Sequence, residues 1–451
     1  MKLIYDVQDK PKFKANLVFA FQQLLAIIAA TLLVPTLVNS IYGQTVLDQA
    51  AALFGAGVGT LVYILFTKRK SPVFLGSSFA FISPLAGAAA FGAFGIILGA
   101  VIAGLVYVII ALIVHFVGTK WVDKLLPPVV IGPTVALIGL SLCTSAISNV
   151  TSVNGSYNLI AVLIGLVTFG VTVLSSVKGG RTLKLIPFIM GILAGYVLAS
   201  VFTAIGNAAN IDYLKIVDYS PIVNNFRSLS FNSFIALPDF TFARAIKEGA
   251  GLLNGAAGII SLLALFAPVA FVVFAEHIAD HENLSSVIGH DLIKDPGLKR
   301  TLLGDGIGSV VGAIFGGCPN TTYGESVGCI AITGNASVST TVLTALMAIL
   351  LSFFTPFVAF VNTIPTCIIG GICIALYGFI AVSGLKMLQV VDLGESENLY
   401  VVSAILVTGI GGLVLDFGAV SISSIATALI VGILTRLIIG KKKKDSKEVE
   451  K

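Results

Sequence analysis

Long apolar runs alternate with short polar segments along most of the 451 residues. A helix that crosses a hydrocarbon core of about 30 Å needs about 20 mostly apolar residues. The runs stay apolar throughout and lack the period-two alternation of membrane β-strands. The pattern therefore predicts an all-α polytopic membrane protein with about fourteen transmembrane segments, at 17–39, 46–66, 73–91, 94–116, 127–148, 157–176, 183–206, 254–281, 299–317, 319–335, 338–360, 364–384, 399–414 and 418–440.

The longest polar link, at about 207–243, divides these segments into two groups of seven. Groups with odd numbers of spans insert with opposite orientations, which predicts an inverted 7+7 repeat. The third and tenth segments match in this repeat, and both combine proline with small polar residues, at 72–84 and 319–324. We expect short extended segments to interrupt spans 3 and 10 and to form a binding site near the membrane midplane. The alternative is that these small residues only allow close helix packing.

Composition agrees with a membrane protein and excludes a soluble domain. The chain is 57% hydrophobic and 11% charged, with a mean hydropathy of +1.02. The net charge of +5 comes largely from the tail at 441–451, which we expect in the cytoplasm, where basic residues collect. An even number of spans places both termini there. Because no other basic surface is evident, nucleic-acid binding is not expected.

The five cysteines lie in or beside apolar runs, without metal-ligand spacing or a disulfide framework. We expect them to be small packing residues and expect no bound metal. The first fourteen residues are too polar and too long for a cleavable signal peptide, so the first apolar run should remain as a membrane helix. The sequence has no G-x-x-x-x-G-K-[ST] loop, which disfavours ATP-driven transport.

Carboxylates within the apolar segments are the main candidates for chemistry. Glu325 lies in the polar stretch CPNTTYGESVGCIAIT, and Glu276 and Asp280 lie four residues apart on one face of the eighth span. An ionisable group at membrane depth indicates a binding site or a proton path. Asp305 in the ninth span either belongs to the proton path or caps a helix. His277 and the nearby His281 lack a third set of ligands for zinc.

Five separated motifs, in this order, are similar to those of the nucleobase/ascorbate transporter family, and most similar to its bacterial uracil permeases. They are LGSSFAFISP (75–84), AEH (275–277), KDPGLKR (294–300), PNTTYGES (319–326) and LYG (376–378). The resemblance implies fourteen spans in a 7+7 inverted repeat. It also implies a core domain from 1–116 and 254–360, a gate domain from 117–206 and 361–440, an extracytoplasmic linker at 207–253 and a homodimer formed through the gate domain.

The resemblance further implies which residues bind the substrate. Glu276 and Glu325 would bind the pyrimidine ring, and the backbone N–H groups of Phe79 and Gly324 would bind its carbonyl oxygens. Uracil presents two N–H donors and two C=O acceptors, which such a site complements. The remaining positions that match the family's pocket are Tyr323, Ser78, Ala30 and Tyr377. Proton coupling would fall to Glu276, Asp280 or Asp305.

Some positions depart from the family pattern and keep a second substrate open. Gln23 stands where the family has histidine, and Ser326 where asparagine is usual. Asp280 and Asp305 are typical of xanthine transporters, whereas Glu325 and the third-span motif are typical of uracil permeases. Because the latter residues would contact the ligand directly, we predict uracil as the substrate and xanthine as the alternative.

The sequence thus predicts a secondary active importer in the cell membrane that couples uracil movement to protons. Its partners would be the nucleobase and the lipid bilayer, and the proton would be its coupling ion in place of a cofactor. A channel would need a polar stripe along several spans, but the polar residues concentrate at one depth. A membrane enzyme would need a nucleophile beside a base, and none is evident.

Overall fold

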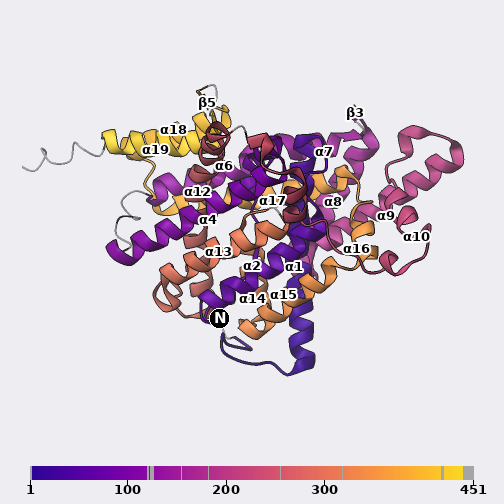
Figure 1. Ribbon diagram of the computed structural model, residues 1–451, viewed down its shortest axis with the longest axis horizontal. Coiled ribbons are helices and arrows are strands. Elements are labelled where there is room, and N and C mark those ends of the chain that lie inside the picture. The colour runs from indigo at the N-terminus through magenta and orange to yellow at the C-terminus, as the bar shows by residue number, and fades with distance from the viewer. Residues whose placement is uncertain are drawn as a thin grey trace, which may run out of the picture.

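The computed structural model describes residues 3–118, 121, 126–153, 155–180, 182–253, 255–316, 318–417 and 421–439. The basic tail at 441–451, predicted to be cytoplasmic, lies outside these residues. Helices make up most of the described chain (Figure 1). Among the described residues, eight helical stretches are long and apolar enough to cross a membrane, and three further apolar helices are shorter. The protein is therefore a mostly helical membrane protein, as predicted.

The N-terminal half, up to the linker, contains eight helices among its described residues. They are α1 (Phe13–Tyr42), α2 (Gln49–Phe66), α3 (Ile82–Ala88), α4 (Gly92–Val117), α6 (Pro128–Ser141), α7 (Cys143–Thr151), α8 (Leu159–Lys178) and α9 (Pro187–Ala209). The described part of the C-terminal half also contains eight. They are α12 (Ala256–Ile288), α13 (Leu298–Gly316), α14 (Gly324–Thr333), α15 (Val338–Ser352), α16 (Thr355–Val361), α17 (Thr366–Met387), α18 (Ser396–Ile410) and α19 (Ser424–Ile439).

Local sequence signals account for several helix ends. The Asp48 carboxylate accepts a hydrogen bond from the Ala51 amide at 3.0 Å and so caps the start of α2. Helix α1 ends at Gly43, whose φ of 81° is readily adopted only by glycine. Helix α12 ends in the same way at Gly289, with φ 72°. These caps satisfy backbone groups that a helix end leaves unpaired.

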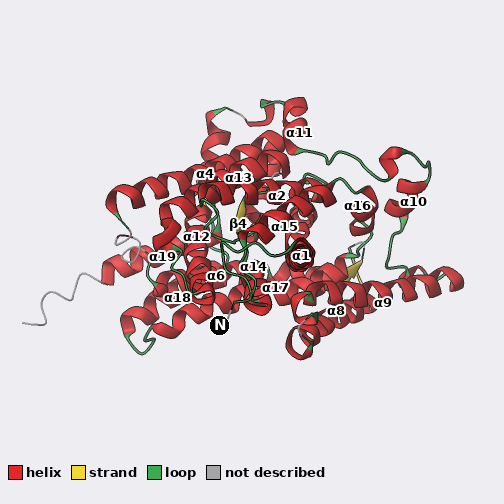
Figure 2. Ribbon diagram, turned by 90° about the horizontal axis from the view of Figure 1, so that it is seen from below, coloured by secondary structure: helices red, strands yellow, loops and turns green. Residues whose placement is uncertain are grey.

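Two short strands interrupt the helical structure at the predicted positions. Strand β1 (Leu75–Ser77) pairs antiparallel with β4 (Asn320–Thr322), with Gly76 opposite Thr321. Figure 2 shows β4 surrounded by helices in the interior of the molecule. The prediction of extended segments at these places is confirmed. Two smaller hairpins, β2 (Ser152–Val153) with β3 (Ser156–Tyr157) and β5 (Leu415–Asp416) with β6 (Ser421–Ile422), lie elsewhere.

Glycines allow a close helix crossing between α2 and α13. A Cβ atom at Gly55 would lie 2.4 Å from the Gly312 carbonyl oxygen, and one at Gly59 would lie 2.8 Å from that of Gly308. Only glycine permits this approach of the two backbones. Close packing is thus the role of these four glycines, which lie outside the third and tenth spans.

The linker between the halves folds back onto the helices, and its described part contains α10 (Ser220–Phe226) and α11 (Thr241–Glu248). Helix α11 packs against α4 and α13. The Arg244 guanidinium donates to the Val46 carbonyl oxygen at 2.7 Å, and the Ala93 amide donates to the Glu248 carboxylate at 2.7 Å. These contacts hold the linker against the first half of the chain.

Candidate functional site

A cavity of about 350 Å³ lies between the end of the strand pair and α17. We call it the central cavity. One wall is polar and comes from α12, β4 and the start of α14. The opposite wall is mostly apolar and comes from α9, α17 and the turn at Leu183–Leu185. The cavity therefore offers hydrogen-bonding groups on one side and a hydrophobic surface on the other, as small-molecule sites usually do.

Five of the eight residues predicted to bind substrate line the central cavity: Glu276, Glu325, Phe79, Gly324 and Tyr323. The strand pair brings them together, because Phe79 follows β1 while Tyr323 and Gly324 follow β4. Glu325 lies in the first turn of α14, where the helix dipole favours negative charge.

The other three predicted residues, Ser78, Ala30 and Tyr377, do not line this cavity. All three are buried, with at most 1% of their surface exposed. The Tyr377 ring nevertheless packs edge-on against the Phe79 ring, with centroids 6.0 Å apart. The two rings therefore contact each other at the edge of the cavity.

The structure also places residues at the cavity that sequence reasoning missed. Thr321 and Thr322 line it from β4, and Phe379 lines it from α17. Lys184 lines it from the turn before α9, and Phe188 from the start of α9. The threonines belong to the PNTTYGES motif, so that motif could have indicated them. The other residues carry no pattern in the sequence, because only the packing of distant helices brings them to the site.

Asp280 lines the cavity beside Glu276, and the Thr322 hydroxyl donates to its carboxylate at 2.6 Å. This bond links α12 directly to β4. Three acids, Glu276, Asp280 and Glu325, thus face one cavity. Among the described residues, no group of three or more His, Cys, Asp or Glu side chains is arranged to hold a metal ion.

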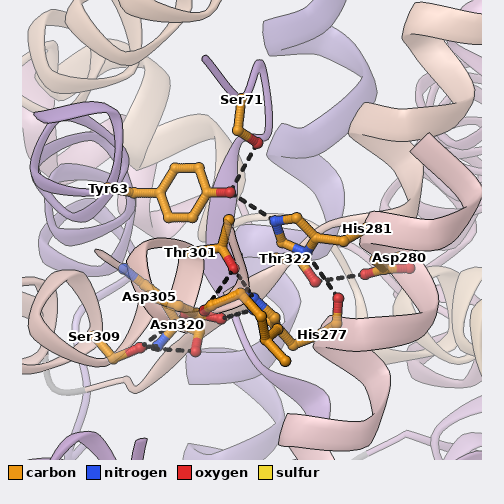
Figure 3. A network of polar contacts seen from close by, with 11 residues as sticks. Tyr63, Ser71, His277, Asp280, His281, Thr301, Asp305, Ser309, Asn320 and Thr322 are labelled. Atoms are coloured by element: carbon orange, nitrogen blue, oxygen red, sulfur yellow. Dashed lines mark hydrogen bonds and ion pairs between the residues drawn. The ribbon is translucent and has the colours of Figure 1, made fainter. Parts of the chain in front are cut away.

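Asp305 does not reach the central cavity but contacts His277, and both side chains are fully buried (Figure 3). Nδ1 of His277 lies 2.8 Å from Asp305 Oδ2, and Nε2 lies 3.0 Å from the Thr301 hydroxyl. That hydroxyl donates its hydrogen to the Leu298 carbonyl, so it accepts from His277 Nε2–H. One further proton then lies between Nδ1 and Oδ2. Whichever atom holds it, the pair is neutral overall.

His281 lies one helical turn beyond His277, and the two rings stack with centroids 4.1 Å apart. Its Nδ1 lies 2.7 Å from the His277 carbonyl oxygen and therefore carries hydrogen. Its Nε2 lies 2.7 Å from the Tyr63 hydroxyl, which is 2.8 Å from that of Ser71 (Figure 3). Neither histidine lines the cavity, and both bind protein groups that tie α12 to α2 and α13.

The two positions that depart from the family pattern in the first and tenth spans contact each other. The Gln23 amide donates to the Ser326 hydroxyl at 3.0 Å, and the Thr344 hydroxyl donates to Gln23 Oε1 at 2.9 Å. The side chains of Gln23 and Ser326 therefore tie α1 to α14, the helix that carries Glu325.

The fold is shared with membrane transporters. It is similar to the transmembrane domain of a cyanobacterium bicarbonate transporter, BicA, with a TM-score of 0.58 and 15% identity over 96% of this chain and 100% of that chain. It is also similar to murine solute carrier 26 family member A9, an anion transporter in the inward-facing state. For that structure the TM-score is 0.62 and the identity 12%, over 97% of this chain and 69% of that chain.

Sequence comparison gives the family. The family model Xan_ur_permease, described as "Permease family", matches residues 14–417. The chain is 39% identical to the uracil permease of Bacillus caldolyticus, over 97% of this chain and 95% of that protein. It is 34% identical to the uracil permease of Escherichia coli (strain K12), over 96% of this chain and 93% of that protein. The chain therefore belongs to this permease family, whose members are multi-pass transporters of the cell membrane and not enzymes.

Proposed function

We propose that this permease imports uracil across the cell membrane together with protons. The observation that carries the proposal is the central cavity, where Glu276 and Glu325 lie beside the ends of two paired strands. The similarity to uracil permeases at 34–39% identity supports the pyrimidine over xanthine. Asp280, which suggested a purine, lines the same cavity but is already bonded to Thr322.

The chemistry of the cavity matches the edges of a pyrimidine ring. Carboxylates accept hydrogen bonds, so Glu276 and Glu325 would bind the two ring N–H groups. Helix α14 begins at Gly324, and the first N–H groups of a helix lack partners within it. The Gly324 amide and that of Phe79, just past β1, would bind the carbonyl oxygens. A site built from such groups rejects ligands that leave them unpaired.

Proton coupling follows from the number of acids at the cavity. Three ionised carboxylates repel one another, and a proton taken up with the substrate would relieve this repulsion. Glu276 and Asp280 are the candidates that face the cavity. Asp305 would contribute through the proton that it shares with His277. One charge moving across 100 mV provides about 2.3 kcal/mol, enough for roughly fiftyfold accumulation of a neutral substrate.

We further propose fourteen spans in a 7+7 inverted repeat. Reciprocal packing supports it: α2 packs against α15 as α13 packs against α4, and α8 packs against α17 as α18 packs against α6. A twofold repeat would match α2 with α13, α4 with α15, α6 with α17 and α8 with α18, so it would exchange the two contacts within each comparison. Residues 1–116 and 254–360 would form the core and 117–206 and 361–440 the gate, with both termini in the cytoplasm. A homodimer through the gate rests on the family resemblance.

The test is radiolabelled uracil uptake into proteoliposomes with an imposed inward proton gradient, with xanthine as competitor. We expect concentrative uptake that resists xanthine and is lost in Glu276→Gln and Glu325→Gln. Glu397→Gln, which removes a carboxylate at the start of α18, is the matched control and should retain uptake. Preferential transport of xanthine would overturn the substrate, and uptake that ignores the gradient would overturn the proton coupling.

A further inference from the structure

A six-residue pattern occurs once in α2 and once in α13. It reads GAGVGT at 55–60 and GDGIGS at 304–309, so both helices carry Gly-x-Gly-x-Gly followed by a hydroxyl residue. The last glycines of the two patterns meet where the helices cross. A Cβ atom at Gly308 would lie 2.7 Å from the Gly59 carbonyl oxygen. This close approach places the following residues, Thr60 and Ser309, on either side of the strand pair.

Thr60 and Ser309 each bind both backbone groups of one strand residue. The Thr60 hydroxyl accepts from the Leu75 amide at 2.9 Å and donates to the Leu75 carbonyl oxygen at 3.1 Å. The Ser309 hydroxyl accepts from the Asn320 amide at 3.2 Å and donates to the Asn320 carbonyl oxygen at 2.9 Å. We call Thr60 and Ser309 the hydroxyl brackets. Figure 3 shows Ser309 beside Asn320.

The hydroxyl brackets hydrogen-bond to the backbone of one residue at each outer edge of the strand pair. A two-stranded sheet has an edge on each side, where N–H and C=O groups have no strand partner. Leu75 and Asn320 are buried, with 0% and 4% of their surfaces exposed. An unpaired backbone group at membrane depth costs several kcal/mol. One hydroxyl serves both groups of a residue because it donates one hydrogen bond and accepts others.

The brackets lie close to the amides proposed to bind substrate. Phe79 lies four residues after Leu75, and Gly324 lies four residues after Asn320. The segments between them are short and extended, so a shift of either strand is passed on to the amide that follows it. We propose that Thr60 and Ser309 are matched positioning residues that hold these two amides in register with the ligand. The proposal rests on the function proposed above.

The experiment measures the KM and maximal rate of uracil uptake in proteoliposomes for Thr60→Val and Ser309→Ala. We expect KM to rise about tenfold in each while the maximal rate per folded protein is retained, because a displaced amide weakens binding. Thr60→Ser and Ser309→Thr keep the hydroxyl and should retain the wild-type KM. Thr168→Val is the matched control, since the buried Thr168 hydroxyl donates to the Ile164 carbonyl of its own helix and not to a strand.

The outcomes separate this proposal from the proposed function. If wild-type protein takes up no uracil, the proposed function fails. If wild-type protein is active and Thr60→Val and Ser309→Ala keep its KM, the brackets do not position the site. A purely structural role would reduce the yield of monodisperse protein and leave KM unchanged in what remains. If neither hydroxyl-deleting variant folds, the hydroxyls are needed for folding and not for positioning, and the proposal is overturned. A raised KM in Thr60→Ser or Ser309→Thr would overturn it as well.

Discussion

Gly76 is the position where a single methyl group should damage the site most directly. A Cβ atom there would lie 2.2 Å from Cε2 and from Cζ of the Tyr323 ring, and 2.6 Å from its hydroxyl oxygen. The ring cannot move freely, because Tyr323 is 2% exposed and its hydroxyl donates to the Ser77 carbonyl at 3.0 Å. Gly76→Ala therefore forces the Tyr323 ring away from strand β1, and Tyr323 directly precedes Gly324.

The size of the effect follows from two terms. Overpacking a buried site costs about 1–3 kcal/mol, and loss of the Tyr323 hydrogen bond adds about 1 kcal/mol. If about 2 kcal/mol of this cost falls on the substrate-binding conformation, the affinity for uracil falls roughly thirtyfold. Uptake kinetics in proteoliposomes, together with binding to purified protein, measure this change.

Gly170→Ala is the matched control for Gly76→Ala. Gly170 lies in α8, away from the central cavity, and a Cβ atom there would meet nothing within 4 Å. We expect this variant to retain the affinity of the wild-type protein, since alanine is favoured over glycine inside a helix. Wild-type affinity in Gly76→Ala would refute the contact between Gly76 and Tyr323 as a determinant of the site.

Two further predictions concern contacts outside the membrane-spanning helices. Lys70 donates to the Asp295 carboxylate at 2.7 Å and holds the pKa of Asp295 below its usual value. The ion pair therefore stabilises the fold at neutral pH, and this stabilisation is lost as the pH falls below about 4. Asp295→Asn should therefore be less thermally stable than wild type at neutral pH, and the two thermal stabilities should become similar only in acid. Arg244→Ala removes the bond to Val46 and should lower the free energy of unfolding by about 1 kcal/mol with KM unchanged; a raised KM would link the linker to the site.

The contact between His277 and Asp305 shows how far sequence reasoning could go at the site. The sequence is compatible with Asp305 either in a proton path or as a helix cap, because a lone acid in an apolar helix has no partner that can be read from spacing. The structure gives His277 as that partner, 28 positions away in the chain. Gln23 and Ser326 are a second example of partners that spacing cannot reveal, since they lie 303 positions apart and hydrogen-bond to each other.

What the sequence alone determined were features that depend on local composition. Continuous apolar runs must form membrane helices because the bilayer offers no hydrogen bonds to their backbones. Proline and small polar residues at 72–84 and 319–324 predicted the interruptions, and the acids at membrane depth, Glu276, Asp280 and Glu325, predicted a binding site or a proton path. Only the tertiary structure shows that α9 and α17 form the opposite wall of the central cavity and that Ser78, Ala30 and Tyr377 do not line it. Only the tertiary structure shows that the Thr60 and Ser309 hydroxyls bond to the strand pair. These depend on which helices cross and how closely, and that is set by packing between residues far apart in the chain.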